Sequence, residues 1–314
     1  MRTAPLVARP LPTGARIAVL LGTAVALSTG SSESVAQTRD ARPPTALIVT
    51  AHPDDDAAFS GAVYQITHQL RGAVDLALVT DGSGGFRYAT LAEPMYGLEL
   101  TNETVARQYL PAIRKRELMA GGAIVGIRNY FFLDQLDHGY ALDADTVLHA
   151  VWDTAFVRRR LVDILTRGEY DVVFGLLPFP ETHAHHKAAT IMALYAASSL
   201  PADRRPAVLG GFPCAFDGRT LTFEGLPGYP VTTVTGGRPL TRFDRTQPLG
   251  YNGRLDFRII ANWVIAEHKS QGTMQLLMNR GDVECYWYFD ANGPAGRDRI
   301  TDLFERLRVP PAGQ

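Results

Sequence analysis

The sequence predicts an α/β protein with a Rossmann-like, mostly parallel sheet and helices on both faces of that sheet. Short apolar runs alternate with longer segments of helical spacing, which is the order of βαβ units. The runs show no polar alternation, so their strands are expected to be buried on both faces, as parallel strands are. Polar clusters directly follow several runs, which places a ligand site beyond the carboxyl ends of the strands.

The first βαβ unit follows a polar lead-in. A strand starts near Ala46 and ends at His52-Pro53, because proline lacks an N–H and biases the residue before it towards an extended backbone. Residues 57–70 then have apolar positions at helical spacing, and 74–80 form a second apolar run. Parallel pairing of these two strands demands a right-handed crossover through the helix.

The same alternation continues to residue 200, with a surface excursion over 86–103 before it resumes. Pro111 predicts a restart within the next helix. The predicted elements are a helix over 104–125, a strand over 129–133, a helix over 146–166, a strand over 171–177 and a helix over 188–198.

The C-terminal third has a different composition. Residues 201–255 are rich in glycine and proline, and they predict a small antiparallel addition with short strands over 220–223 and 231–234. A helix over 257–279 and an aromatic strand over 285–289 are expected to close the chain.

The N-terminal residues have the composition of a secretory signal peptide. Arg2, Arg9 and Arg16 precede an apolar segment over 17–27, and small residues follow up to Ala36. That apolar segment of 11 residues is too short to cross a bilayer as a helix, which takes about 20. We therefore expect cleavage near Ala36 and a secreted or periplasmic mature protein with no membrane span.

One domain is expected after cleavage, since 278 of the 314 residues remain. The predicted organisation is a signal peptide over 1–36, a lead-in over 37–45, a Rossmann-like metal-binding core over 46–200, and a C-terminal part of the same domain over 201–314.

Cleavage removes three arginines and one glutamate, so the formal net charge changes from −1 to −3. No basic block remains, which favours a small-molecule or glycan substrate over nucleic acid. The oligomeric state is not encoded in any pattern.

The chain has two cysteines, Cys214 and Cys285. An exported protein permits a disulfide, and two buried thiols are the alternative.

Two clusters of histidines and carboxylates stand at the carboxyl ends of predicted strands. They are His52-Pro53-Asp54-Asp55-Asp56 after the first strand and His183-Ala184-His185-His186 after the fourth. His183 and His186 are three residues apart at a helix start, so they are expected on nearly the same face. Two imidazoles and one carboxylate, with one position left for water, form the ligand set of many catalytic zinc sites. Water on zinc ionises near neutral pH, and a second carboxylate can accept its proton as general base.

This pair of motifs resembles the PIG-L, or LmbE-like, family of zinc-dependent N-deacetylases of N-acetylglucosaminyl compounds. The family usually has A-H-P-D-D-E at the first strand and H-P-D-H at the later helix. The resemblance implies that His52, Asp55 and His186 bind one Zn²⁺ per chain, or another divalent metal such as Fe²⁺. It further implies Asp54 as general base and His183 as the residue facing the tetrahedral intermediate.

Weaker matches extend the resemblance along the chain. Arg114 and Glu117 match an R-x-x-E-L helix of the family, and Asp137 matches an acidic residue after the third strand. The resemblance implies that Arg114 and Asp137 contact the sugar. His268-Lys269-Ser270-Gln271 is similar to the H-x-S-Q turn found late in these chains.

Two positions depart from the family pattern. Asp56 stands where the family usually has glutamate, and His185 stands where it usually has aspartate. Two roles are possible for His185: it can support the metal ligands as a hydrogen-bond partner, or it can compete with His186 for the metal. Asp56 has no predicted role.

The resemblance implies a secreted zinc-dependent amidohydrolase. Metal-bound hydroxide would remove an N-acyl group, with acetyl the expected one, from an amino-sugar substrate. Alternatives are a zinc amidase acting on a non-sugar amide or thiol conjugate, and a non-haem iron oxygenase, whose facial triad has the same ligand types. A sugar-binding module without catalysis is a further alternative. A nucleotide-binding protein is disfavoured, because no G-x-G-x-x-G follows the first strand.

Overall fold

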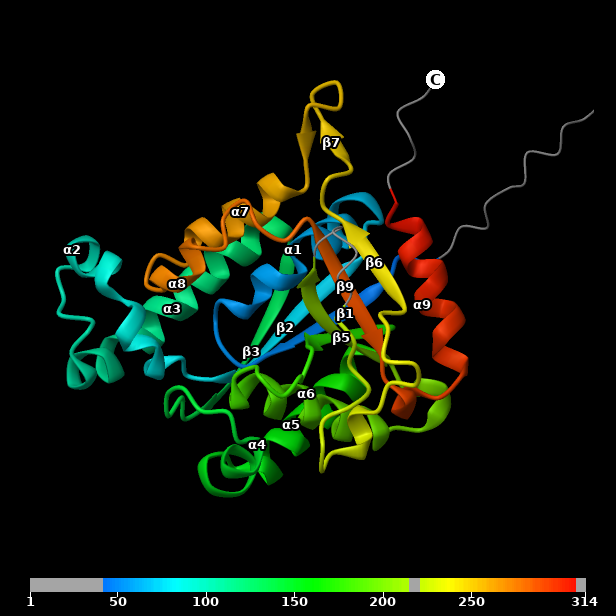
Figure 1. Ribbon diagram of the computed structural model, residues 1–314, viewed down its shortest axis with the longest axis horizontal. Coiled ribbons are helices and arrows are strands. Elements are labelled where there is room, and N and C mark those ends of the chain that lie inside the picture. The colour runs from blue at the N-terminus through cyan, green and yellow to red at the C-terminus, as the bar shows by residue number, and fades with distance from the viewer. Residues whose placement is uncertain (1–41, 215–220, 309–314) are drawn as a thin grey trace, which may run out of the picture. The chain divides into compact units, whose positions relative to one another are not determined.

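A seven-stranded sheet in the order β3-β2-β1-β4-β5-β9-β6 forms the centre of the computed structural model, which describes residues 42–214 and 221–308 (Figure 1). The strands are β1 (Thr45–Thr50), β2 (Ala73–Thr80), β3 (Ile127–Gln135), β4 (Val172–Leu176), β5 (Ala207–Cys214), β6 (Thr241–Asp244) and β9 (Val283–Tyr288). The pairs from β3 to β5 are parallel, and β9 is antiparallel to β5 and β6. The predicted fold class, with a small antiparallel addition, is confirmed. The predicted signal peptide lies outside the described residues.

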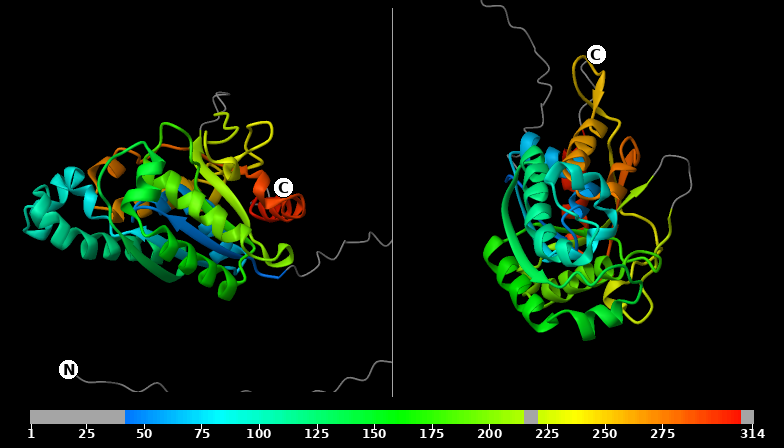
Figure 2. Two further views of the ribbon diagram at one scale, coloured as in Figure 1. Left: turned by 90° about the horizontal axis from the view of Figure 1, so that it is seen from below. Right: turned by 90° about the vertical axis from the view of Figure 1, so that its left-hand side faces the viewer.

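Helices cover both faces of the sheet (Figures 1 and 2). One face packs against α5 (Thr154–Gly168) and α6 (Ala184–Ser198), and the other against α1 (Ser60–Tyr64), α3 (Glu103–Val125), α7 (Arg258–Glu267) and α9 (Ala295–Arg306). In β1, Leu47 and Val49 join the first face, whereas Ala46 and Ile48 join the second. Because successive strand residues point to opposite faces, an uninterrupted apolar run is buried on both sides.

The remaining elements are short. They are α2 (Glu93–Tyr96), α4 (Ala144–Thr146), α8 (Gly272–Gln275), a ribbon of β7 (Pro248–Gly250) and β8 (Leu255–Asp256), and the single-turn helices η1 (Asp55–Phe59), η2 (Gln65–Gln69), η3 (Ser83–Tyr88), η4 (Thr90–Ala92), η5 (Val147–Val151), η6 (Ala202–Arg204), η7 (Pro230–Thr232) and η8 (Asp290–Asn292). In the described part of the chain, no helix is both long enough and apolar enough to cross a bilayer.

Three predicted helices differ from the observed ones. The helix expected over 146–166 is divided into η5 and α5, because the side chain of Asp153 caps the start of α5. The helix expected over 257–279 ends as α7 at Glu267, and residues 268–271 turn before α8. In contrast, α3 continues through Pro111, where a restart was expected.

The C-terminal prediction was wrong in its strands. It missed the parallel strand β5, and the segments 220–223 and 231–234 form no strand where the structure describes them. Gly210 and Gly211 give β5 a low strand propensity. Tertiary packing needs them nonetheless, because a Cβ on Gly211 would lie 2.5 Å from the ring of Phe59.

A disulfide joins Cys214 at the end of β5 to Cys285 in β9, with their Cα atoms 6.0 Å apart. It settles the question of bridge or free thiols. The bridge closes a loop with a sequence separation of 71 residues, so chain entropy predicts a stabilisation of about 4 kcal/mol. It also holds the end of β5 against its antiparallel neighbour.

Candidate metal centre and active site

The site lies where the strand order reverses. β1 has β2 on one side and β4 on the other, so the chain turns away in opposite directions at their carboxyl ends. Ligands of doubly wound sheets bind in the crevice at such a point. The segment after β1 provides His52 and Asp55, and the first turn of α6, which follows β4, provides His186.

Three ligand atoms from these residues converge. His52 Nδ1 lies 2.9 Å from His186 Nε2, Asp55 Oδ1 lies 3.1 Å from His186 Nε2, and His52 Nδ1 lies 3.8 Å from Asp55 Oδ1. Four tetrahedral ligands at the bond lengths of zinc, about 2.0–2.1 Å, are spaced about 3.3 Å apart. The donor set and its spacing therefore fit one ion of that size.

The carboxylate of Asp55 is held in place by the backbone. Its Oδ2 accepts hydrogen bonds from the N–H groups of Ala51 and His52 at 3.0 and 2.8 Å, which leaves Oδ1 directed to the histidines. Burial opposes ionisation of Asp55, but the charges and hydrogen bonds of His186 and His52 outweigh it and hold the pKa well below its usual range. Asp55 is therefore ionised at neutral pH, as a metal ligand must be.

Both histidines of this group have a hydrogen-bond partner for the other ring nitrogen. His186 Nδ1 lies 3.1 Å from the hydroxyl of Thr182, and His52 Nε2 lies 3.1 Å from His185 Nδ1. When these nitrogens carry the protons, the opposite lone pairs face the converging site. Such outer partners orient ligating imidazoles in metal sites.

His185 is fully buried behind His52 rather than beside Asp55. Its Nε2 lies 2.7 Å from His138 Nδ1, and its ring stacks on Trp152 with centroids 5.4 Å apart. Burial, followed by the charge of His52, lowers the pKa of His185, so the ring is neutral. His52, His185 and His138 thus form a chain of imidazoles, and the sequence contained no signal for His138.

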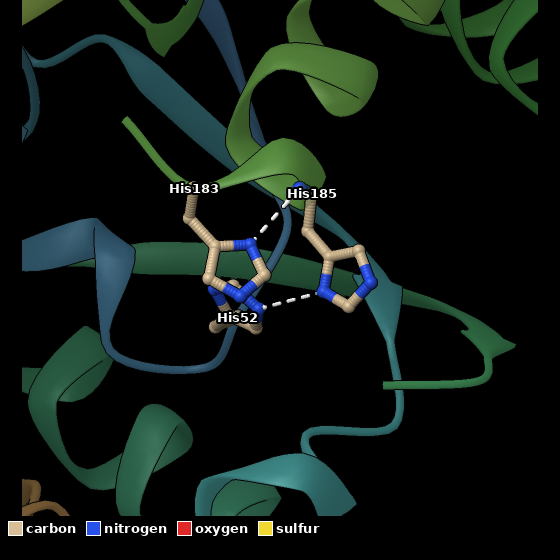
Figure 3. A group of neighbouring side chains, drawn as sticks. All are labelled: His52, His183 and His185. Carbon is tan, nitrogen blue, oxygen red and sulfur yellow. Dashed lines mark hydrogen bonds between the residues drawn. The ribbon is translucent and has the colours of Figure 1, made fainter. Parts of the chain in front are cut away.

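A second group that could hold a metal consists of His52, His183 and His185 (Figure 3). Figure 3 shows the rings of His183 and His185 projecting from the start of α6 towards His52. This group uses the opposite side of the His52 ring and contains no carboxylate. The group with Asp55 matches the mixed ligand set better.

His183 directs a hydrogen-bond donor into the site. It caps α6, and its Nδ1 accepts the backbone N–H of His185 at 3.0 Å, so the neutral ring carries its proton on Nε2. Burial, followed by the charges of His52 and His186, lowers the pKa of His183 to about 3. The ring contacts His52 edge-on, with centroids 4.8 Å apart.

Asp54 forms an ion pair with Arg114, whose Nη2 donates to Asp54 Oδ1 at 2.8 Å. Arg114 Nη1 also donates to the carbonyl of Gly82 at 2.8 Å. Asp137 accepts the N–H of Gly139 and lies beside His52. Arg114 and Asp137, the two residues predicted to contact the sugar, are only 3% and 2% exposed. In this structure their side chains contact other residues of the site.

The glycine-rich segment after β2 packs tightly against these two residues. A Cβ on Gly84 would lie 2.3 Å from Asp137 Oδ1, and a Cβ on Gly85 would lie 2.6 Å from Arg114 Nη1. Gly82 has a φ of +72°, which favours glycine. The glycines therefore permit the backbone to approach Arg114 and Asp137 closely.

Asp56 forms a buried pair with His268 and is not part of the group of candidate metal ligands. Its Oδ1 lies 2.9 Å from His268 Nε2, and both side chains are buried. Burial raises the pKa of Asp56, although His268 opposes the effect. In the same turn, the N–H and hydroxyl of Ser270 donate to Glu117 of α3. The late H-x-S-Q turn thus connects the acidic turn to α3.

A pocket of about 530 Å³ adjoins these groups, and Asp54, Asp55 and His186 all line it. The candidate base and two of the candidate ligands therefore face one common space. Pockets of this size hold small-molecule ligands.

Several solved structures are similar to the chain. N,N'-diacetylchitobiose deacetylase from Pyrococcus horikoshii shares 17% identity, over 79% of this chain and 84% of that one, with a TM-score of 0.47. The zinc-inhibited form of teicoplanin deacetylase shares 16%, over 78% and 97%, with a TM-score of 0.47. A 4-carboxy-2-hydroxymuconate hydratase from Pseudomonas putida shares 15%, over 78% and 95%, with a TM-score of 0.48.

No curated protein matched the chain. Residues 47–197, which include the segment after β1 and all of the predicted metal ligands, match the model of the PIG-L family, described as GlcNAc-PI de-N-acetylase. This match confirms the expected class of enzyme, an N-deacetylase hydrolase. Residues 47–197 of this chain therefore belong to the PIG-L family.

Proposed function

We propose that this protein is a zinc-dependent N-deacylase that removes an acyl group, acetyl in the simplest case, from an amino-sugar substrate. The observation that carries the proposal is the convergence of His52 Nδ1, Asp55 Oδ1 and His186 Nε2 beside a pocket that Asp54, Asp55 and His186 line. Three ligands with a separate carboxylate beside them suit hydrolysis of an amide. The family description, a de-N-acetylase of a GlcNAc compound, supports the same reaction.

The proposed roles follow from the contacts of each side chain. A divalent ion held by His52, Asp55 and His186 would supply Lewis acidity and lower the pKa of bound water. Asp54, oriented by Arg114, accepts the proton of the attacking water and returns it to the leaving nitrogen. His183 donates a hydrogen bond from its Nε2–H to the oxyanion and keeps its proton. The C–O bond to the attacking water forms first, the acyl C–N bond then breaks, and the products are a carboxylate and an amine.

Release of acetate tests this proposal. Purified protein is incubated with N-acetylated sugars and with non-sugar N-acetyl amides, in parallel samples with zinc, with Fe²⁺ and with a chelator. We expect acetate release from the sugars with metal and none with chelator. Release from non-sugar amides alone would favour a zinc amidase of another substrate class. Turnover that needs iron, oxygen and an oxidisable co-substrate would favour the oxygenase, and sugar binding without release would favour a binding module.

Export to an oxidising compartment is part of the proposal. The basic, apolar and small-residue order of residues 1–36 supports it, and so does the disulfide between Cys214 and Cys285. We expect the exported protein to begin directly after Ala36, which N-terminal sequencing checks. An uncleaved N-terminus on the exported protein would contradict this expectation.

A further inference from the structure

We propose that the pocket beside the metal ligands binds the acyl chain of the substrate, and that this chain is an apolar one longer than acetyl. The inference rests on the proposed function and specifies its substrate class. It is carried by the chemistry of the pocket wall, its volume and its position relative to the candidate catalytic groups.

The pocket wall is mostly apolar. Its side chains come from the ends of β4 and β5, from α7 and from the segment around α8. They include Leu176, Leu177, Phe212, Ile265, Met274 and Leu277. The polar lining residues Asp54, Asp55, Thr182 and His186 belong to the candidate catalytic site and its support. The apolar part of the pocket therefore begins where the amide would be cleaved.

Arg245 also lines the pocket, but its charge is already paired. Its Nε donates to Glu284 at 2.7 Å, and its Nη2 donates to the carbonyls of Ala57 and Ala58 at 2.9 and 3.1 Å. Arg245 and Glu284 are both buried, so the pair stays within the wall. Arg280, a further lining residue, is exposed to solvent. The interior of the pocket thus offers a ligand mainly apolar surface.

The pocket is too large and too apolar for an acetyl group or a sugar ring. A single methyl group would fill little of 530 Å³. A sugar would lose the hydration of its hydroxyls there without matching partners, and each such group costs about 1–3 kcal/mol. An acyl chain gains from burial with every methylene, by up to about fourfold in affinity.

The amino-sugar part of the substrate would lie outside the apolar pocket, on the side of His52 where His183 and Asp137 lie. His183 and Asp137 do not line this pocket, although both contact or adjoin His52. The ring of His183 meets Tyr140, which is exposed, with centroids 5.1 Å apart. The two sides of His52 therefore differ. One side meets His183 and Asp137, which lie outside the pocket, and the other side meets His186 and Asp55, which line it.

A series of N-acyl glucosamines tests the inference. The zinc-loaded protein is given acetyl, butanoyl, hexanoyl and octanoyl derivatives, and release of glucosamine is measured for all of them. We expect kcat/KM to rise with chain length, by at least about tenfold from acetyl to octanoyl. If the acetyl compound is the best substrate, the acyl-pocket proposal fails and the proposed function stands. If no compound releases glucosamine, the proposed function fails, and the pocket is judged by whether octanoate binds more tightly than acetate.

Two adjacent leucines provide a matched pair of variants. Leu276 and Leu277 are 68% and 43% exposed, so neither is part of the core, and only Leu277 lines the pocket. Leu277→Asp is expected to lower the octanoyl-to-acetyl ratio of kcat/KM, and the affinity for octanoate, by about tenfold or more. Leu276→Asp is expected to leave both rates and the octanoate affinity at wild-type values. Equal effects of the two substitutions, with both variants melting at the wild-type temperature, would overturn the proposal.

Discussion

The Asp54→Asn variant is expected to lose about 10²–10⁴-fold in kcat and to keep its metal. Asparagine has nearly the same shape, and its amide oxygen can still accept the hydrogen bond from Arg114, but it cannot take a proton. Asp54 is outside the converging group of His52, Asp55 and His186, so metal binding does not depend on it. Steady-state kinetics of acetate release and metal analysis of the same sample measure the two quantities.

A surface carboxylate serves as the control for this variant. Asp163 pairs with Arg160 and Arg167 on α5, outside the pocket, so Asp163→Asn is expected to retain the wild-type rate. Wild-type turnover by Asp54→Asn would remove Asp54 as the general base. Loss of the metal from Asp54→Asn would make it a ligand rather than a base.

His52→Ala is expected to lose both tight metal binding and activity. The substitution removes one of three converging ligand atoms, so only His186 and Asp55 remain to bind the metal. Because ligand residues matter more than their outer partners, whose loss costs about 10–100-fold, we expect metal affinity to fall by more than about 100-fold. Competition with a chromophoric chelator measures the affinity without recourse to enzyme activity.

His185 provides graded comparisons in the same assay. His185→Ala removes the partner of His52 Nε2 and is expected to weaken metal binding by about 10–100-fold. His185→Asp introduces the residue usual in the family and is expected to recover part of that loss, because a carboxylate can accept the same hydrogen bond. His149→Ala, at an exposed position, is the neutral control. Wild-type zinc affinity in His52→Ala would contradict the assignment of the metal centre.

Parts of the fold were predictable because they depend on local patterns. The apolar run of β1 needs only its own residues to indicate a strand buried on both faces, and His52-Pro53 marks its end. The strand β5 was missed for the opposite reason. Its glycines oppose strand formation locally. They are required because side chains from other parts of the chain pack directly against them, Phe59 against Gly211 and Leu177 and Phe289 against Gly210.

For the candidate site, the sequence by itself determined the residue types and their places at the ends of β1 and β4, since strand ends and helix starts are local features. Only the tertiary structure decided which atoms meet. It brings His52 and His186 together across 134 positions, directs His185 to His138, and pairs Asp56 with His268 across 212 positions. The pocket and the disulfide arise in the same way, because the pocket walls and the two cysteines come from segments that are far apart in the sequence and meet only in the folded chain.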